Sequence, residues 1–213
     1  PTIRKASANT DPAYDRAQDI IKESHKTGRR KLILLSGVPG SGKTLVGIRL
    51  SYESEFSKLA TTRIIPRSNG TFQEITPPNA SIFLSGNGPL VAVLKNALGR
   101  GSNQFIQDVR KYVQHHESGD KRIPLHHVII FDEAQRAWDK GKVERRHKGA
   151  VIGSEPDMFI GMANRIPDWG AVVGLIGTGQ EIHDGEESGL QQWVDAIVNT
   201  GSVDNWDIHA PPG

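Results

Sequence analysis

The sequence predicts an α/β fold, with a mostly parallel central sheet between two layers of helices. Short, nearly uninterrupted apolar runs have the length of buried strands, and amphipathic helical patterns alternate with them. Strands that alternate with helices form parallel sheets that are covered on both faces. In such sheets ligands bind beyond the carboxyl ends of the strands. The residues that follow the strands are therefore the first candidates for function.

The composition excludes several classes of protein. The chain has 213 residues, which suits one large domain or two small ones, and 36% of them are apolar. The formal net charge of +2 gives no overall argument for a nucleic-acid or membrane partner. The absence of cysteine excludes disulfides, thiolate zinc sites and cysteine nucleophiles, and it fits a cytoplasmic location. No apolar run approaches the roughly 18–20 residues of a membrane-spanning helix, so we expect no membrane partner.

The first regular elements are a helix, a strand and a second helix. Asp11 and Pro12 start a helix that Gly28 ends, because a capping aspartate, an early proline and a terminal glycine favour these positions. The apolar run 31–36 predicts a buried strand. Residues 44–52 predict the helix that follows it.

The middle of the chain predicts further strands and helices around a polar segment. Residues 61–79 are polar and contain three prolines, which indicates a loop or an edge hairpin. Residues 81–84 predict a second buried strand, and residues 89–98 predict a helix with proline in its first turn. Residues 103–117 predict another helix, whose apolar side consists of Phe105, Ile106, Val109, Tyr112 and Val113.

The last part of the chain continues the alternation. It predicts, in order, a strand at 128–131, a basic loop at 139–153, a helix at 155–165, a strand at 171–176, a helix at 188–199 and a strand at 206–209.

The turn after the first strand has the pattern of a phosphate-binding loop. The segment GVPGSGKT matches G-x-x-x-x-G-K-[ST] and consists of Gly37, Val38, Pro39, Gly40, Ser41, Gly42, Lys43 and Thr44. Glycines allow successive backbone amides to turn toward an anion, and the following helix adds its positive end. Lys43 supplies a charge for the β- and γ-phosphates, and the Thr44 hydroxyl is a Mg²⁺ ligand. A simple glycine turn would require neither Lys43 nor Thr44.

The strand at 128–131 delivers two carboxylates. In a nucleotide hydrolase Asp132 holds the Mg²⁺ shell, and Glu133 orients and deprotonates the attacking water. A strand followed by Asp-Glu is also common as a turn or helix cap, but the phosphate loop earlier in the chain favours the catalytic interpretation. Glu133 argues against small-molecule kinases, and no Asn-Lys-x-Asp stands in the chain to select guanine.

A third polar turn follows the strand at 171–176. In the segment GTGQ, residues 177–180, Gln180 is placed to contact a γ-phosphate and the attacking water, and so to sense hydrolysis. A surface turn with no function is the alternative interpretation.

These three motifs, in this order, resemble the core of superfamily 1 helicases. More narrowly, the chain resembles the Schlafen group 3-like DNA/RNA helicase domain of bacterial ATPases. The stretches that carry this resemblance are SGVPGSGKTLVG (36–47), IFLSGNGPLVAVL (82–94), VIIFDEAQRAWD (128–139), SEPDMFI (154–160) and LIGTGQEIHDGEESGLQQW (175–193). The resemblance implies a RecA-like P-loop NTPase domain with a three-layer αβα sandwich, Mg·ATP hydrolysis and a nucleic-acid track.

The resemblance also assigns roles to individual residues. It implies that Lys43, Glu133 and Gln180 are catalytic, that the phosphate loop binds ATP, and that Thr44 and Asp132 hold Mg²⁺. Gln135 and Arg136 would contribute to the nucleotide site by linking the acidic motif to a neighbouring domain or to the Gln180 turn.

The resemblance further implies that part of the motor is missing. Such helicases need a second RecA-like domain whose arginine completes the ATP site, and nothing after residue 209 supplies it. We divide the chain into an arm and leading helix (1–30), the RecA-like domain (31–209) and a tail or linker (210–213). Because an arginine finger is worth ~10³–10⁵ in rate, we expect weak ATPase activity and no unwinding from this fragment. Gln18 is the one candidate for an adenine-reading glutamine in the first helix.

Two segments are candidates for nucleic-acid contact. The turn of Ser85, Gly86 and Asn87 precedes a helix and offers free amides to a phosphate, although a helix cap by Asn87 is an equal alternative. The basic stretch 140–148 includes Lys142, Arg145 and Arg146, which would guide a phosphate backbone unless the stretch is only a solvated loop. The four tryptophans favour packing over base stacking. The adjacent histidine pairs 115–116 and 126–127 have poor geometry for zinc.

The sequence is consistent with three functions. The first is an ATP-hydrolysing motor domain, the N-terminal half of a motor core that moves on single-stranded DNA or RNA. The second is an ATP-dependent switch in a regulatory or defence assembly, without translocation. The third is a small-molecule kinase, which Glu133 and the Gln180 turn disfavour.

Overall fold

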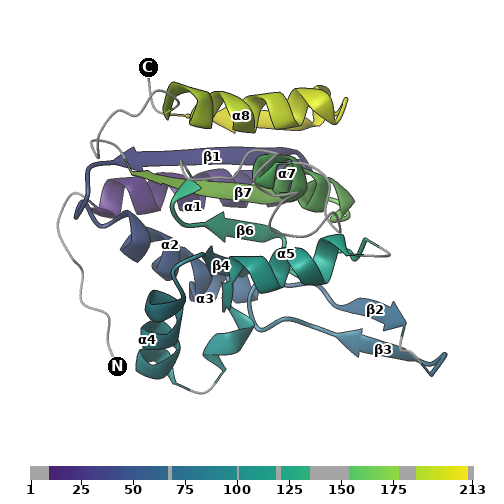
Figure 1. The fold of residues 1–213 in the computed structure, drawn as a ribbon. Coiled ribbons are helices and arrows are strands. Elements are labelled where there is room, and N and C mark those ends of the chain that lie inside the picture. Colours follow the sequence, from purple (N-terminus) through teal and green to yellow (C-terminus); the bar gives the residue numbers. More distant parts are fainter. Residues whose placement is uncertain are drawn as a thin grey trace.

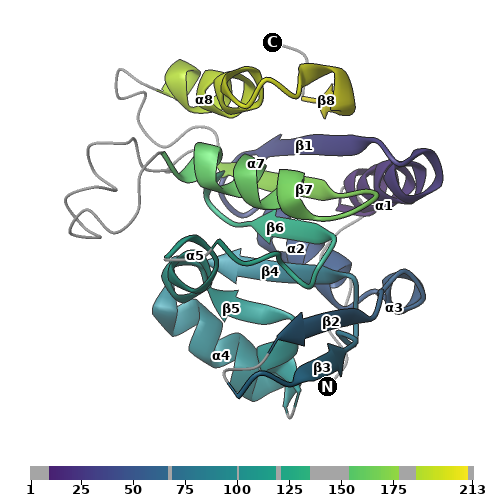
Figure 2. The ribbon, with the colours of Figure 1, turned by 90° about the vertical axis from the view of Figure 1, so that its right-hand side faces the viewer.

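The computed structural model describes residues 10–66, 69–99, 101–118, 121–134, 154–177 and 186–210, without the side chains of Thr10 and of residues 186–190. Its centre is a six-stranded parallel sheet in the order β5-β4-β6-β7-β1-β8. In Figure 2 the strands follow one another from β8 at the top to β5 near the bottom, and Figure 1 shows β1, β7, β6 and β4 in the same order. The strands are β1 (Arg30–Gly37), β4 (Ser81–Ser85), β5 (Ile106–Asp108), β6 (Val128–Phe131), β7 (Ala171–Gly177) and β8 (Trp206–His209).

Helices cover both faces of this sheet. One face packs against α1 (Thr10–Thr27), α2 (Lys43–Ser51), α3 (Ser54–Ser57) and α4 (Gly88–Leu98). The other face packs against α5 (Val109–Glu117), α7 (Glu155–Arg165) and α8 (Glu186–Asn199). Short 3₁₀ turns, η1 (Ser102–Gln104) and η3 (Val203–Asn205), precede β5 and β8. The predicted three-layer α/β sandwich with a parallel sheet is therefore confirmed.

The strands are apolar throughout because both faces are buried. In β6, Val128 and Ile130 belong to the core on the α1–α2 side, while Ile129 and Phe131 belong to the core on the α7–α8 side. All four side chains are at most 4% exposed. Side chains alternate between the faces of a strand, so a continuous apolar run is what a strand buried on both faces requires.

The parallel register brings several strand ends to one edge of the sheet. Gly37 at the end of β1 pairs with Gly177 at the end of β7. Phe131 at the end of β6 pairs with Gly174 of the same strand β7. The chain therefore leaves three neighbouring strands at the carboxyl edge, where Asp132 and the predicted phosphate loop follow.

The prediction of one helix over residues 103–117 is wrong. The segment instead forms η1, the edge strand β5 and the shorter helix α5, because residues 106–108 pair in parallel with residues 83–85 of β4. The Asp108 carboxylate then caps α5 by accepting hydrogen bonds from the amides of Arg110 and Lys111, at 3.0 and 3.1 Å. Ile106 lies in the strand rather than on a helical face. The mistake arose because a three-residue strand has no periodicity of its own.

Other predicted elements match with shifted ends. The segment 61–79 contains the antiparallel hairpin β2 (Arg63–Pro66) and β3 (Phe72–Ile75), which forms a separate two-stranded sheet. The short helix α3 has no counterpart in the prediction. Of the arm predicted over residues 1–10, the structure describes only Thr10, which begins α1, and the basic loop at 139–153 lies outside the described residues. Across the described ranges, no helix has both the length and the apolar character of a membrane span.

Candidate functional site

The phosphate-loop motif connects β1 to α2 at the carboxyl edge of the sheet. Gly40 has φ 79° and Gly42 has φ 89°, which is the left-handed region that favours glycine. Gly42 is the N-cap of α2, and its carbonyl accepts the amide of Val46 at 3.0 Å. The loop closes on itself where the Ser41 amide donates to the Val38 carbonyl at 3.1 Å. The backbone therefore has the turn that the motif predicts, followed by the start of a helix.

Close packing fixes two further glycines. A Cβ atom on Gly37 would lie 2.7 Å from Ser41 Oγ, so a side chain at this position would force Ser41 to move. A Cβ atom on Gly47 would lie 2.6 Å from Leu175 Cδ1 and 3.0 Å from Phe83 Cε2. α2 thus packs so closely against the sheet that there is no room for a side chain at Gly47. This close packing fixes where the N-terminus of α2 lies relative to the loop.

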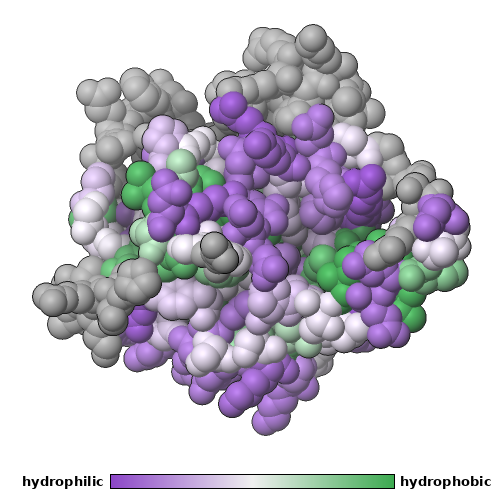
Figure 3. Space-filling view, turned by 90° about the horizontal axis from the view of Figure 1, so that it is seen from below, coloured by the Kyte–Doolittle hydropathy of each residue, from purple (hydrophilic) through white to green (hydrophobic). Residues whose placement is uncertain are grey.

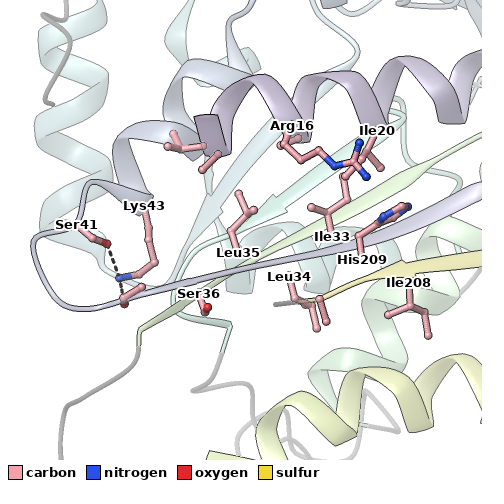
Figure 4. Close-up of a pocket in the computed structure, with 15 residues that line it drawn as sticks. Arg16, Ile20, Ile33, Leu34, Leu35, Ser36, Ser41, Lys43, Ile208 and His209 are labelled. Atoms are coloured by element: carbon pink, nitrogen blue, oxygen red, sulfur yellow. Dashed lines mark hydrogen bonds between the residues drawn. The ribbon is translucent and has the colours of Figure 1, made fainter. Parts of the chain in front are cut away.

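The Lys43 side chain folds back over its own loop (Figure 4). Its ammonium donates to the carbonyl oxygens of Gly37 and Val38, the latter at 2.9 Å, and contacts Ser41 Oγ at 3.4 Å. Burial lowers the pKa of Lys43, while the negative charges of Glu133 and Asp132 raise it. The Lys43 ammonium therefore lies against the carbonyl oxygens of its own loop.

Asp132 and Thr44 meet although 88 positions separate them. Thr44 Oγ1 donates to Asp132 Oδ1 at 3.3 Å. The Asp132 amide donates to the Leu84 carbonyl at 2.9 Å, which holds the residue at the end of β6. Asp132 is 5% exposed, and burial, followed by the charge of Glu133, raises its pKa to about 6. A hydroxyl oxygen beside a carboxylate is a donor set that suits Mg²⁺, so these residues fit the ion.

Glu133 occupies a turn that places its exposed side chain beyond the sheet. Its φ is 59°, and Asp168 is the other non-glycine residue with positive φ in the described ranges. Such backbone conformations cost about 1–3 kcal/mol and recur at functional sites. The side chain lines a hollow of about 370 Å³ next to Asp132. The predicted acid pair therefore has one buried and one exposed carboxylate.

Several predicted site residues lie outside the described part of the chain. These are Gln135, Arg136, Lys142, Arg145, Arg146 and Gln180. The described chain stops at Gly177 before the Gln180 turn, and Gly177 pairs with Gly37 of the phosphate loop. β7 thus ends beside that loop.

A trough of about 530 Å³ extends from the phosphate loop between α1 and the end of β8. Its walls are mainly apolar, and two longer polar side chains, Arg16 from α1 and His209 from β8, reach toward the same part of it (Figure 4). Among the described residues, His209 Nε2 is buried and has no hydrogen-bond partner. The apolar residues are Ala13, Ala17, Ile20, Ile33, Leu34, Leu35, Val46, Ile208 and Ala210.

The sequence pointed to Gln18 rather than to these two residues. Gln18 does not line the trough, and its amide donates instead to Glu55 Oε2 at 3.3 Å. Arg16 and His209 are 193 positions apart, and no local motif marks either of them. Only the β1–β8 pairing, in which Ile33 lies opposite His209, brings the end of the chain to this trough.

The turn of Ser85, Gly86 and Asn87 has the geometry of a helix cap. Asn87 Oδ1 accepts the Leu90 amide at 3.1 Å, and the Asn87 amide donates to Ser85 Oγ at 3.2 Å. The same turn lines the hollow of about 370 Å³ that Asp132 and Glu133 also line. The structure thus brings this turn to the acid pair, and nucleic-acid contact there remains a prediction.

The tryptophans pack as predicted. Trp169, Trp193 and Trp206 are at most 5% exposed, and Trp138 lies outside the described residues. The histidine rings bind backbone carbonyls: His116 Nδ1 lies 2.9 Å from the Tyr112 oxygen and His127 Nδ1 lies 2.9 Å from the Trp169 oxygen.

A comparison with protein families identifies the family of this chain. Residues 30–210 match the model of the family described as Schlafen group 3, DNA/RNA helicase domain, and the chain belongs to this family. Among curated proteins, none matches the sequence. A similar solved structure is the helicase domain of Hef from Pyrococcus furiosus, with 15% identity and a TM-score of 0.42 over 91% of this chain. This chain spans 37% of that one.

Proposed function

We propose that this Schlafen group 3 helicase domain binds ATP with Mg²⁺ and hydrolyses it to ADP and phosphate. Its role would be that of the N-terminal half of a motor that moves on single-stranded DNA or RNA. The observation that carries the proposal is the contact of Thr44 Oγ1 with Asp132 Oδ1, with the Lys43 ammonium close by. A structural turn would require none of these three side chains at the same strand edge.

The chain's own groups have distinct roles in this proposal. The amides of the loop and the positive end of α2 hold the β- and γ-phosphates, and Lys43 exchanges its carbonyl contacts for phosphate oxygens. Thr44 and Asp132 hold Mg²⁺, which neutralises phosphate charge when bound. Glu133 is exposed beside Asp132, so its carboxylate accepts the proton of the attacking water.

The trough beside the loop suits the nucleoside. It opens from Gly37, Ser41 and Lys43, so a nucleotide whose phosphates lie on the loop extends its sugar and base along the trough. The apolar walls cover the faces of the base, while the Arg16 guanidinium stacks on it and His209 Nε2 offers a polar contact. We assign to Arg16 and His209 the position that the sequence suggested for Gln18.

The other residues predicted from the sequence would have roles in sensing the nucleotide and in contacting nucleic acid. Gln180 would sense the γ-phosphate, and Gln135 and Arg136 would transmit the nucleotide state to the neighbouring domain. The turn of residues 85–87 would contact a strand phosphate, with Lys142, Arg145 and Arg146 guiding the backbone. The arginine of a second RecA-like domain would raise the rate by ~10³–10⁵, so this domain alone binds ATP better than it hydrolyses it.

Two variants test the proposal. Lys43→Ala should abolish ATP binding measured by calorimetry, because it removes the charge for the phosphates. Glu133→Gln should still bind Mg·ATP but lose most turnover in a longer chain with the second domain. Unchanged binding and turnover in both variants would reject the site. Stimulation of turnover by single-stranded nucleic acid supports the motor, and its absence at every chain length would indicate a switch.

A further inference from the structure

A second hollow lies at the opposite edge of the sheet. Its volume is about 1000 Å³, and it lies between β2 and the chain that leads from α5 into β6. Arg63 of β2 reaches His127, whose Nε2 lies 3.2 Å from Arg63 Nη2, and His127 directly precedes β6. The hollow is thus at the amino end of β6, while Asp132 is at its carboxyl end. We call it the β2 groove. It is lined by residues 63–66 of β2, by Gln107 of β5, by Tyr112, His115 and His116 of α5, and by Ser118, Lys121, Arg122, Ile123, Leu125 and His126.

The β2 groove follows the unpaired edge of β2. All four residues of β2 line it, although successive side chains of a strand point to opposite faces. No residue of β3 lines it, and in the described chain β2 pairs with β3 alone. A hollow that touches both faces of a strand but not its neighbour runs along the free edge, where backbone N–H and C=O groups point outward.

The groove has apolar surface beside this edge. Ile64 is 66% exposed on β2, and Ile123 is 49% exposed on the opposite wall, next to Leu125. Figure 3 shows hydrophobic surface on the side where Figure 1 places the hairpin, next to hydrophilic surface. Exposed apolar side chains at a strand edge are typical of a surface that receives another chain.

The charge of the groove has one sign. Arg63, Lys121 and Arg122 line it, and the one carboxylate paired with them in the described chain is Glu117 at the end of α5, 3.5 Å from the Lys121 ammonium. Arg122 is held in place because its Nη1 donates to the His115 carbonyl at 3.2 Å. Burial lowers the pKa of His116 to about 4, so this ring adds no charge at neutral pH. The complementary partner is therefore acidic.

Two buried polar atoms in the lining residues lack partners. The Tyr112 hydroxyl and Arg63 Nε make no hydrogen bond within the described chain. Tyr112 itself is 2% exposed, and burial raises the pKa of its hydroxyl. Unpaired buried donors are costly, so the polar groups of these two residues are not fully satisfied within the described chain.

We propose that the β2 groove binds an extended peptide segment of a partner protein, added as a strand to the free edge of β2. The segment carries acidic side chains for Arg63, Lys121 and Arg122, alternating with apolar side chains for the wall at Ile123. Pro66 has no N–H to offer, so the pairing is short and centred on residues 63–65. The groove and the phosphate loop share no lining residue.

Selection from a random peptide library tests the proposal. The full chain is the target, and synthetic copies of the enriched peptides are measured by fluorescence anisotropy. Enriched peptides should alternate acidic and apolar residues and should slow amide exchange in β2. The exposed double charge reversal Lys121→Glu/Arg122→Glu should weaken their binding about tenfold or more, because acidic side chains then meet like charges.

A matched double variant controls for net charge. Lys26→Glu/Lys58→Glu changes two exposed lysines that do not line the groove, and it should leave peptide affinity unchanged. Three outcomes would overturn the proposal: no enriched peptide, enriched peptides that bind the Lys121/Arg122 variant equally well, or protection of amides elsewhere. If the Lys121/Arg122 variant lost affinity for a short oligothymidylate but not for the peptides, the groove would be a nucleic-acid site. This result would also overturn the proposal.

Discussion

At the scale of single residues, the site depends on where side chains are absent as much as on where they are present. Gly40 and Gly42 have left-handed backbone conformations, whereas Gly37 and Gly47 are needed because a Cβ atom would collide with a neighbour. Lys43 and Thr44 then follow directly at the start of α2, so the chemistry of the loop is placed by backbone geometry. Thr44 reaches Asp132 only because α2 lies this close to the sheet.

Gly47→Ala tests this close approach. The new methyl group would lie 2.6 Å from Leu175 Cδ1, so we expect a loss of about 1–3 kcal/mol in the free energy of unfolding, as for overpacked cores. Urea denaturation measures it, with Gly88→Ala as the control, because no atom lies within 4 Å of the Cβ position there. Equal stability of the two variants would mean that α2 does not depend on contact at Gly47.

Arg16→Ala tests the nucleoside trough separately from the phosphate loop. We expect the dissociation constant for ATP to rise about 2- to 30-fold, the range of a lost cation–π contact, with little change for inorganic tripolyphosphate. The matched control is Asp15→Ala, an exposed neighbour that does not line the trough. Calorimetric titration distinguishes the outcomes: equal loss for both ligands, or no loss, would contradict a role in holding the base.

At the scale of elements, β1 joins the phosphate loop to α1 and β8. Lys31 on β1 is 1% exposed, and its ammonium contacts Glu23 of α1 at 3.0 Å and Asp207 of β8 at 2.7 Å. Hydrogen bonds from Arg29 and Lys31 hold the pKa of Asp207 well below its usual range. The three elements that surround the trough are therefore tied together by one buried cation.

This cluster predicts a loss of stability in acid. A carboxylate with a lowered pKa in the folded state stabilises the protein above its unfolded pKa of about 3.9, and this contribution disappears as the pH falls toward the folded value. Asp207→Asn should cost about 1–2 kcal/mol at pH 7, reduced from a fully buried pair because Asp207 is partly exposed and Glu23 remains.

The measurement is the free energy of unfolding between pH 7 and pH 3. The advantage of the wild type over Asp207→Asn should begin to shrink below about pH 4 and should be smaller at pH 3 than at pH 7, while Asp19→Asn, an exposed neighbour on α1, should follow the wild type throughout. A constant difference at all pH values would show that the carboxylate charge does not supply the stability.

Four of the six strands of the central sheet could be predicted from apolar runs in the sequence, whereas β5 could not. β1, β4, β6 and β7 could be predicted because strands buried on both faces are continuous apolar runs. β5 could not, since it is three residues long and is defined by its pairing with β4. The carboxylate of Asp108, which caps α5, was the one local sign that the helix starts later than its apolar spacing suggests.

At the scale of the whole molecule, the parallel sheet separates two edges with different roles. The carboxyl edge gathers the phosphate loop and the acid pair, and the sequence predicted this meeting because strand ends in parallel sheets converge. The trough with Arg16 and His209 could not be predicted, since it forms between elements from the two ends of the chain. The β2 groove was equally hidden, because it depends on how a separate hairpin lies against α5.

The most direct test of the central claim is a crystal structure of the chain with Mg²⁺ and a non-hydrolysable ATP analogue. We predict the β- and γ-phosphates on the amides of the 37–42 loop, Lys43 moved from the Gly37 and Val38 carbonyls to phosphate oxygens, and the ion beside Thr44 and Asp132. An analogue bound elsewhere, with Lys43 still on those carbonyls at saturating nucleotide, would contradict the account.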